Sequence, residues 1–196
     1  MDFHQTINRL PFIFTRHISN FAQFKVRPMH QTKVRQNDPA LQPRSRGLRP
    51  KLLAVSSGGG HWIQLMRIKH AFEDCLVTFV TVHDSYRNQV ADHNFYVVND
   101  ANRWDKIGLL RAARKLAWII WTEKPDIVIS TGAAPGYFAL RLGRLIGART
   151  IWLDSIANVE ELSMSGSWIG HSADLWLTQW PHLARPEGPH YAGSVL

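Results

Sequence analysis

The sequence has a single cysteine, Cys75, among its 196 residues, so no disulfide can form within the chain. Cys75 opens a short apolar run that ends at Val80, and we expect a reduced thiol, buried in a cytosolic protein. Long apolar segments are also missing. The longest candidate, Leu116–Trp121, has six residues, whereas a membrane-spanning helix needs roughly 18 or more. The apolar stretch Leu10–Phe14 is interrupted by Pro11 and is too short for a secretory signal.

Acidic residues are scarce only at the start of the chain. Residues 1–50 contain 9 of the 23 Lys and Arg but 2 of the 15 Asp and Glu, which accounts for +7 of the net charge of +8. Residues 51–196 contain the other 14 basic and 13 acidic residues and carry a net charge of +1. Because the basic character belongs to the first fifty residues, we expect the folded body not to bind nucleic acid.

Residues 1–50 are predicted to form a basic, largely disordered leader. In residues 3–24, apolar side chains are mixed with Arg9, Arg16 and His17. This mixture fits either a short amphipathic segment on an anionic membrane surface or a leader without a function of its own. Residues 25–50 contain four prolines and many Arg and Gln residues, which is typical of a disordered linker.

From residue 51 onward, short apolar runs alternate with longer amphipathic segments, which predicts one domain over residues 51–196. Expected strands cover residues 51–56, 75–82, 95–98, 126–130, 150–153 and 174–178, and expected helices cover 61–72, 104–122, 137–146 and 163–171. This alternation is typical of an α/β fold with a single Rossmann-like, doubly wound parallel sheet. In such sheets, ligands bind at the carboxyl ends of the strands.

The helix expected over residues 104–122 is the longest one and ends before Pro125. Its apolar residues recur at helical spacing, which predicts one face toward the core and a basic face toward solvent. The residues expected to face the core are Ile107, Leu110, Leu116, Ile119 and Ile120, and those expected to face solvent are Arg111, Arg114 and Lys115.

A glycine-rich segment, Ser56–His61, connects the first expected strand to the first expected helix. Its glycines let the backbone approach a ligand closely, and the helix start offers free N–H groups to an anion. A phosphate or diphosphate is the expected ligand, although a tight turn without a ligand fits the pattern too. The segment lacks the Gly-Lys-Ser/Thr of a Walker loop, and Ile63 replaces the third glycine of a dinucleotide fingerprint. The expected anion-binding residues here are Ser57, Gly58, Gly59 and Gly60.

His61 is the candidate titrating group, because the positive end of a helix dipole favours a neutral imidazole that can act as a general base. A purely structural histidine is the alternative.

A second segment, Ser130–Gly136, also leads from a strand into a helix at the same edge of the sheet. Its small residues add Thr131 and Gly132 to the expected anion site, so the two loops predict a cleft for an extended anionic ligand.

A third polar segment follows the fifth expected strand. Asp154, Ser155 and Glu160 are candidates for contacts with the ligand or with a partner, although Glu160 fits a solvated surface equally well. Ser163 fits a helix cap. The remaining histidines show no metal-ligand spacing, so we expect no metal and no cofactor.

Three segments resemble one protein family: Ser155–Gly166, Ala173–Pro181 and Pro189–Gly193. They are similar to the asparagine-linked glycosylation fourteen family, the acceptor-binding, membrane-anchoring subunit of the UDP-N-acetylglucosamine transferase that builds lipid-linked oligosaccharides. Bacterial relatives serve exopolysaccharide and lipopolysaccharide synthesis. The two glycine-rich loops match in order and spacing, so the resemblance covers about Leu52–Leu196. The hydrophobic amino-terminal anchor of eukaryotic members has no counterpart in residues 1–50.

The resemblance implies the amino-terminal half of a GT-B glycosyltransferase, as in the peptidoglycan lipid-intermediate N-acetylglucosaminyltransferase. It implies that the first loop binds the diphosphate of a lipid-linked acceptor and that His61 is the general base. Residues 51–196 suffice for one Rossmann-like domain, so a separate donor-binding glycosyltransferase subunit is expected to bind the UDP-sugar. The donated sugar is expected to be N-acetylglucosamine or a related hexose. The expected location is the cytoplasm, at the inner surface of a membrane.

Two other functions remain compatible with the sequence. The chain could be a non-catalytic scaffold that recruits and activates a donor-binding partner. It could also be a stand-alone nucleotide-binding domain, because His83 and Asp84 follow the second expected strand, where a Rossmann enzyme binds ribose.

Overall fold

The computed structural model describes residues 49–100 and 104–195 of the chain, and the leader expected over residues 1–50 lies almost entirely outside this part. The strands are β1 (Lys51–Val55), β2 (Leu76–Thr81), β3 (Asn94–Val97), β4 (Ile127–Ser130), β5 (Arg149–Leu153), β6 (Leu175–Thr178) and β7 (His190–Tyr191). The helices are α3 (Gly60–Arg67), α4 (Lys106–Glu123), α5 (Ala133–Leu145) and α6 (Met164–Ile169), with short 3₁₀ helices η2 (Lys69–Phe72), η3 (Asp84–Val90), η4 (Gly170–Ser172) and η5 (Pro181–Leu183).

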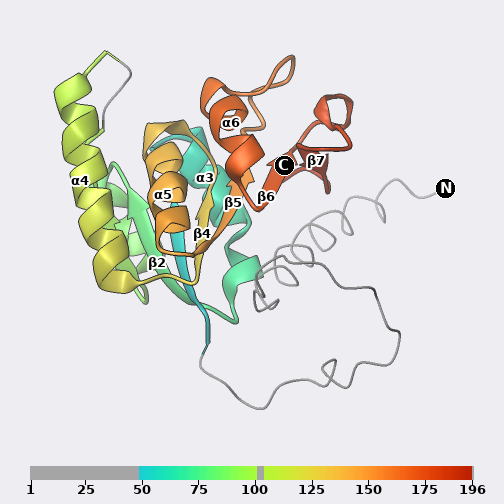
Figure 1. Ribbon diagram of the computed structural model, residues 1–196. Helices are drawn as coiled ribbons and strands as arrows, with labels where there is room; N and C mark the ends of the chain where they lie inside the picture. Colours follow the sequence, from blue (N-terminus) through green and yellow to red (C-terminus); the bar gives the residue numbers. More distant parts are fainter. Residues whose placement is uncertain (1–48, 101–103, 196) are drawn as a thin grey trace, which may run out of the picture.

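All seven described strands form one parallel sheet in the order β3-β2-β1-β4-β5-β6-β7. Helix α3 covers one face, and α4 and α5 lie side by side on the other (Figure 1). The central strands β1, β2, β4 and β5 are buried on both faces, which explains why most of their residues are apolar. The predicted fold class, a single Rossmann-like parallel sheet, is therefore confirmed, and each of the six predicted strands ends within one residue of the observed position.

Two apolar cores lie on opposite faces of the sheet. Alternate residues of β1 point to each of them, so that Leu52 packs with the α3 side and Leu53 with the α4 and α5 side. Trp62 and Phe79 are two of the large aromatic groups of the first core and meet edge to face at 5.9 Å. Trp152 has the largest fully buried side chain of the second. The cores fix α3 and α5 against the central strands that they follow.

The prediction for the core-facing side of α4 was wrong in two positions. Ile107 and Leu110 are 66% and 63% exposed. The buried face of the helix instead consists of Gly108, Ala112, Leu116, Ile119 and Ile120. Small residues in the first half of the helix allow a close approach to its neighbours, and the apolar pattern alone did not distinguish this stripe from a second apolar stripe on the outer side.

Two boundaries also differ from the prediction. Helix α5 begins at Ala133 rather than at residue 137, because Pro135 lies in the first turn, where the missing N–H of proline needs no helical partner. The second glycine-rich loop is accordingly shortened to Thr131 and Gly132. Strand β7 has two residues and no apolar run that could have predicted it.

Cys75 is buried and free, as predicted. Burial raises the pKa of its thiol, with a smaller contribution from the nearby Asp74.

Because the thiolate is the reactive species, Cys75 of the folded protein should react with Ellman's reagent at least about 100-fold more slowly than that of the unfolded chain. The absorbance of released thionitrobenzoate in buffer and in guanidinium chloride measures both rates. Equal rates would contradict the burial of this residue.

Candidate functional site

The two glycine-rich loops meet at the point where the strand order reverses. Strands β1 and β4 are neighbours, but the chain first passes from β1 to β2 and β3 and then returns to β4. The helices that follow β1 and β4 therefore diverge to opposite faces of the sheet. Open parallel sheets bind their ligands between two such carboxyl ends, and we call this position the crevice.

His61 and Thr131 connect the two loops through a reciprocal pair of hydrogen bonds. The Nδ1 atom of His61 lies 2.8 Å from the carbonyl oxygen of Thr131, and the hydroxyl of Thr131 donates to the carbonyl oxygen of His61 over 2.8 Å. Thr131 is fully buried and His61 is half-buried. Two residues separated by 70 positions thus hold the amino ends of α3 and α5 together.

This contact determines the tautomer of His61. A carbonyl oxygen only accepts hydrogen bonds, so Nδ1 must carry the hydrogen. In the neutral ring the lone pair is then on Nε2, which is the form required of a general base. No protein group bonds Nε2 among the described residues.

Gly132 provides the space for this imidazole. A Cβ atom built on Gly132 would lie 2.4 Å from Cε1 of His61, well inside van der Waals contact, and the φ angle of +139° is one that other residues rarely adopt. Glycine is thus required at position 132 for two reasons: its backbone conformation is unfavourable for other residues, and a side chain there would collide with the His61 ring.

The opposite side of the first loop rests on η3. A Cβ atom on Gly58 would lie 2.4 Å from the ring of His83, and the N–H of Gly59 donates to the Tyr86 hydroxyl over 3.0 Å. Tyr86 is itself stacked on Trp62 at 4.9 Å between ring centroids. His83 was named from the sequence only for the nucleotide-binding alternative, and Tyr86 was not predicted as a site residue because no recognisable motif marks it.

The amino ends of α3 and α5 are open, unlike those of α4 and α6. Asp105 caps α4 and Ser163 caps α6 with a side-chain hydrogen bond, the latter as predicted. Helices α3 and α5 have glycine at the N-cap position, with no side-chain cap. Their first-turn N–H groups, such as those of Gly60 and Ala133, have no intrahelical partner and remain available to an anion.

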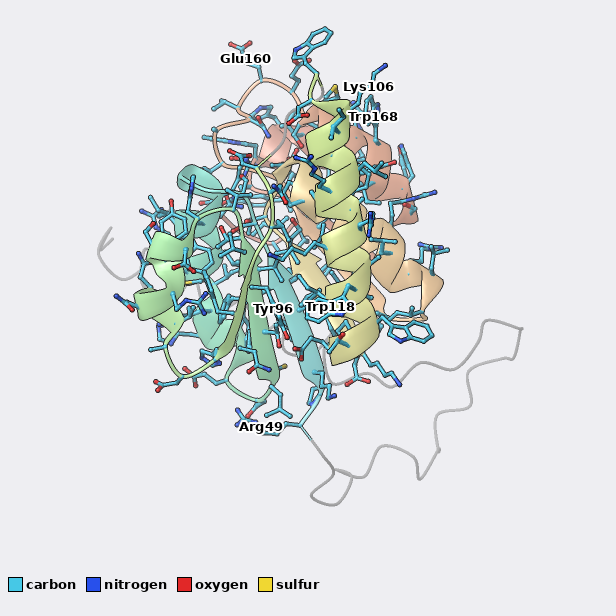
Figure 2. All side chains as sticks on the ribbon, turned by 90° about the vertical axis from the view of Figure 1, so that its left-hand side faces the viewer. Arg49, Tyr96, Lys106, Trp118, Glu160 and Trp168 are labelled. Carbon is cyan, nitrogen blue, oxygen red and sulfur yellow. The ribbon has the colours of Figure 1, made fainter. Side chains whose placement is uncertain are left out.

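The third loop is fixed by a buried carboxylate. Asp154 is 1% exposed, and its two oxygens accept hydrogen bonds from the N–H groups of Ser155 and Ser163 and from the side-chain amide of Asn158, at 2.9 to 3.2 Å. Its carboxylate is therefore engaged in holding the loop. Glu160 lies on the outside of this loop and points to solvent (Figure 2).

Two buried glutamines connect the third loop to the rest of the site. Gln64, one turn after His61, and Gln179 both donate to the carbonyl oxygen of Asp154, over 3.2 and 2.9 Å. Gln64 also accepts a hydrogen bond from the N–H of Ile156. Neither glutamine was predicted as a site residue. A glutamine on the apolar side of an amphipathic helix is the one signal that could have drawn attention to Gln64.

A groove of about 490 Å³ adjoins the crevice at Gly59 and continues along α3. It is lined mainly by Trp62, Ile63, Met66 and Tyr86, with Arg67 at its rim. A larger cavity of about 570 Å³ lies at the amino ends of β1 and β2, at the opposite edge of the sheet from the loops. Within residues 49–100 and 104–195, no cluster of three His, Cys, Asp or Glu residues is placed to hold a metal ion.

A model of the family described as Oligosaccharide biosynthesis protein Alg14 like matches residues 98–195, half of the chain. The chain belongs to the Alg14-like family. The match covers the second and third loops, with Thr131, Gly132, Asp154 and Ser155. It begins after the first loop, so its span is narrower than the resemblance inferred over Leu52–Leu196.

The UDP-N-acetylglucosamine transferase subunit ALG14 of Yarrowia lipolytica is 35% identical to this Alg14-like chain over 72 residues. The aligned segment makes up 34% of this chain and 33% of the relative, so the match spans about a third of the relative's length.

Two solved structures share the fold. MurG from Acinetobacter baumannii superposes with a TM-score of 0.58 at 13% identity, covering 74% of this chain and 46% of MurG. UDP-N-acetylglucosamine 2-epimerase from Rickettsia bellii gives the same TM-score at 14% identity, covering 76% of this chain and 46% of the epimerase. The Alg14-like chain thus has the architecture of one half of a GT-B enzyme, which confirms the fold expected from the resemblance.

Replacing Gly132 by alanine should displace the His61 ring and strain the backbone, with a loss of about 1–3 kcal/mol in the free energy of unfolding. Urea denaturation measures the loss. Gly60→Ala is the matched control, because a Cβ atom there meets nothing within 4 Å, and it should cost less than about 0.5 kcal/mol. Equal stability of the two variants would contradict the packing of His61 on Gly132.

Proposed function

We propose that this chain is the acceptor-binding subunit of a two-component glycosyltransferase. A donor-binding partner would supply the UDP-sugar, N-acetylglucosamine or a related hexose, and this chain would present a lipid-diphosphate-linked saccharide of exopolysaccharide, lipopolysaccharide or related synthesis. The observation that carries the proposal is the crevice at the switch point, where two uncapped helix ends flank a histidine of fixed tautomer.

The crevice suits a diphosphate better than a single phosphate. Helix α3 offers the N–H groups of Gly60 and His61, and α5 offers those of Ala133 and Ala134, at two helix ends held together by the His61–Thr131 contact. Each helix end can bind one negatively charged phosphate, because its unpaired N–H groups and the positive end of the helix dipole both attract an anion. Two such ends accommodate two linked phosphates, and the absence of a Cβ on Gly60 keeps the approach open.

His61 is the proposed general base. Its Nε2 would take the proton from the attacking hydroxyl of the acceptor while the hydroxyl oxygen forms a bond to the anomeric carbon of the donor sugar. The bond from that carbon to the UDP oxygen breaks in the same step, and UDP leaves with the electron pair. Thr131 keeps the ring oriented through Nδ1 and stabilises the imidazolium that forms, because a carbonyl accepts from either protonation state.

The partner and the membrane belong to the same proposal. The described residues form one Rossmann-like sheet, and the relative from Yarrowia lipolytica is named a transferase subunit, which supports a donor site on a second subunit. A lipid-linked acceptor is found in a membrane, so the chain would work at its cytoplasmic surface. Within residues 49–100 and 104–195, no helix combines the length and the apolar character needed to cross a bilayer.

The test of the base is His61→Ala in the reconstituted pair of subunits. Removing a general base should lower kcat by at least about 10²-fold, while the two subunits still associate. The matched control is His70→Ala, because His70 is exposed on η2, beyond the carboxyl end of α3, and contacts Glu73 there. Transfer assays with radiolabelled UDP-sugar measure both variants, and unchanged turnover in His61→Ala would remove this residue from the mechanism.

The test of the diphosphate site is Gly60→Glu beside Gly60→Gln. Both side chains have the same size and project from the open start of α3, but only glutamate adds a negative charge. The KM for the acceptor should rise at least about tenfold more in Gly60→Glu than in Gly60→Gln. A non-catalytic scaffold predicts equal KM values in the two variants, so this pair also separates the two functions.

A further inference from the structure

The outer face of α4 carries large apolar side chains that the rest of the described structure leaves exposed. Ile107, Leu110, Trp118 and Trp121 expose between 56% and 72% of their surface. Tyr96 supports one of them, because its ring meets that of Trp118 edge to face at 5.9 Å (Figure 2). Apolar side chains exposed singly are ordinary, but four on one helix face form a patch that calls for an interaction partner.

These four residues lie along one line of the helix, which we call the α4 stripe. At 100° per residue, positions 107, 110, 118 and 121 fall within an arc of roughly 80° and extend over about 21 Å of helix, with Arg114 between Leu110 and Trp118. The buried residues Gly108, Ala112 and Leu116 lie on the opposite side. The stripe therefore makes no contribution to the core. Helix α4 has one apolar face buried against the core and a second line of apolar side chains exposed on its outer face.

The charges beside the stripe are mainly positive. Lys106, Arg111, Arg114 and Lys115 are exposed on α4, and its two acidic neighbours lie at the ends, Asp105 as the N-cap and Glu123 in a hydrogen bond with Tyr96. Helix α5, which lies beside α4, has no acidic residue and adds the exposed Arg141. The opposite face of the sheet differs, because its charges are mixed: the exposed carboxylates Glu73, Asp74, Asp84 and Asp92 occur there with the exposed Arg67, Lys69 and Arg87.

We propose that the α4 stripe is the docking surface for an anionic lipid bilayer. Tryptophan prefers the boundary between acyl chains and headgroups, while arginine and lysine beside it pair with lipid phosphates. Aliphatic side chains such as Leu110 enter the acyl region. The opposite face carries nearly balanced charges and is not attracted to an anionic surface in this way, so the basic residues of α4 orient the molecule.

The position of the stripe favours lipid over the donor-binding partner. A donor half must face the crevice at the carboxyl ends of the strands. The α4 stripe begins near that edge at Ile107 but continues along the flank of the sheet to Trp121, next to the amino end of β4. Most of the stripe therefore lies outside the reach of a subunit that covers the crevice.

One part of this inference rests on the proposed function, namely the delivery of a membrane-bound acceptor to the crevice. With α4 lying on the bilayer, its amino end and the crevice are at the same edge of the molecule, so a diphosphate at the membrane surface can reach Gly60 without leaving its lipid. The binding of lipid by the stripe is itself independent of what the crevice binds.

A site-specific label distinguishes docking through α4 from attachment through the basic residues 1–50. We would convert Leu110 to cysteine in the full-length chain and attach an environment-sensitive nitrobenzoxadiazole (NBD) fluorophore, because the native Cys75 is buried. Ile63→Cys is the matched control, since Ile63 is an exposed apolar helix residue on the opposite face of the sheet. Vesicles of phosphatidylcholine with roughly one third phosphatidylglycerol are the probe, beside vesicles of phosphatidylcholine alone.

The expected result is a blue shift and quenching by acyl-chain spin labels for the probe at position 110, on anionic vesicles, with no change at position 63. Exchanging Arg111 and Arg114 for glutamine should weaken vesicle binding about fivefold per arginine. Exchanging Leu110 and Trp121 for glutamine should weaken it at least about tenfold. A probe at position 110 that stays in water, whether or not the protein binds vesicles, would overturn the inference.

A blue shift at position 110 caused by the donor-binding subunit without vesicles would also overturn it, because the stripe would then be a protein interface. Transfer to a short-chain, water-soluble acceptor separates the two proposals. The pair containing Leu110→Gln and Trp121→Gln should keep its rate on this acceptor and lose rate only on vesicle-bound lipid acceptor. If the wild-type pair transfers no sugar to either acceptor, the proposed function fails, while the position of the label still decides the docking surface.

Discussion

The hydrogen bonds between His61 and Thr131 are the interaction on which the geometry of the crevice depends. They join the first turn of α3 to the loop before α5, two segments that belong to opposite faces of the sheet. The same contact fixes the tautomer of His61, and Gly132 leaves the ring its space. In the proposed mechanism, this orientation before binding would make His61 an efficient base, because the acceptor would meet a lone pair already in position.

Buried polar groups extend this rigidity to the third loop. Gln64 lies one helical turn after His61 and bonds the backbone on both sides of Ser155, while Gln179 bonds the carbonyl oxygen of Asp154 from β6. A buried polar side chain left unpaired would cost about 1–3 kcal/mol, so these residues hold the loop in one arrangement. Three loops from β1, β4 and β5 are thus connected through α3. The crevice is a preformed site, with its open N–H groups at the two helix ends that lack side-chain caps.

Much of the fold could be predicted from the sequence, since apolar runs and glycine-rich turns mark β1 to β6 and place both loops at one edge. Among the residues predicted for the site, His61 contacts both Thr131 and Gly132, and their role in binding stays a prediction. Other residues that contact these loops could not be predicted, because they are distant in the sequence and become neighbours only in the fold. His83 packs on Gly58, and the Tyr86 hydroxyl accepts a hydrogen bond from Gly59. Helix α4 shows the same limit. Two apolar stripes occupy one helix, and only packing decides which faces the core.

The most direct test of the central claim, that this sheet offers a diphosphate crevice and receives its activated sugar from a partner, is calorimetry on the purified chain alone. The titrants are a short-chain lipid diphosphate saccharide, the matching monophosphate and UDP-N-acetylglucosamine. The account predicts that the diphosphate binds, that the monophosphate binds at least about tenfold more weakly, and that the nucleotide sugar does not bind. Tight binding of UDP-N-acetylglucosamine by the chain alone, or equal affinity for the mono- and diphosphate, would contradict it.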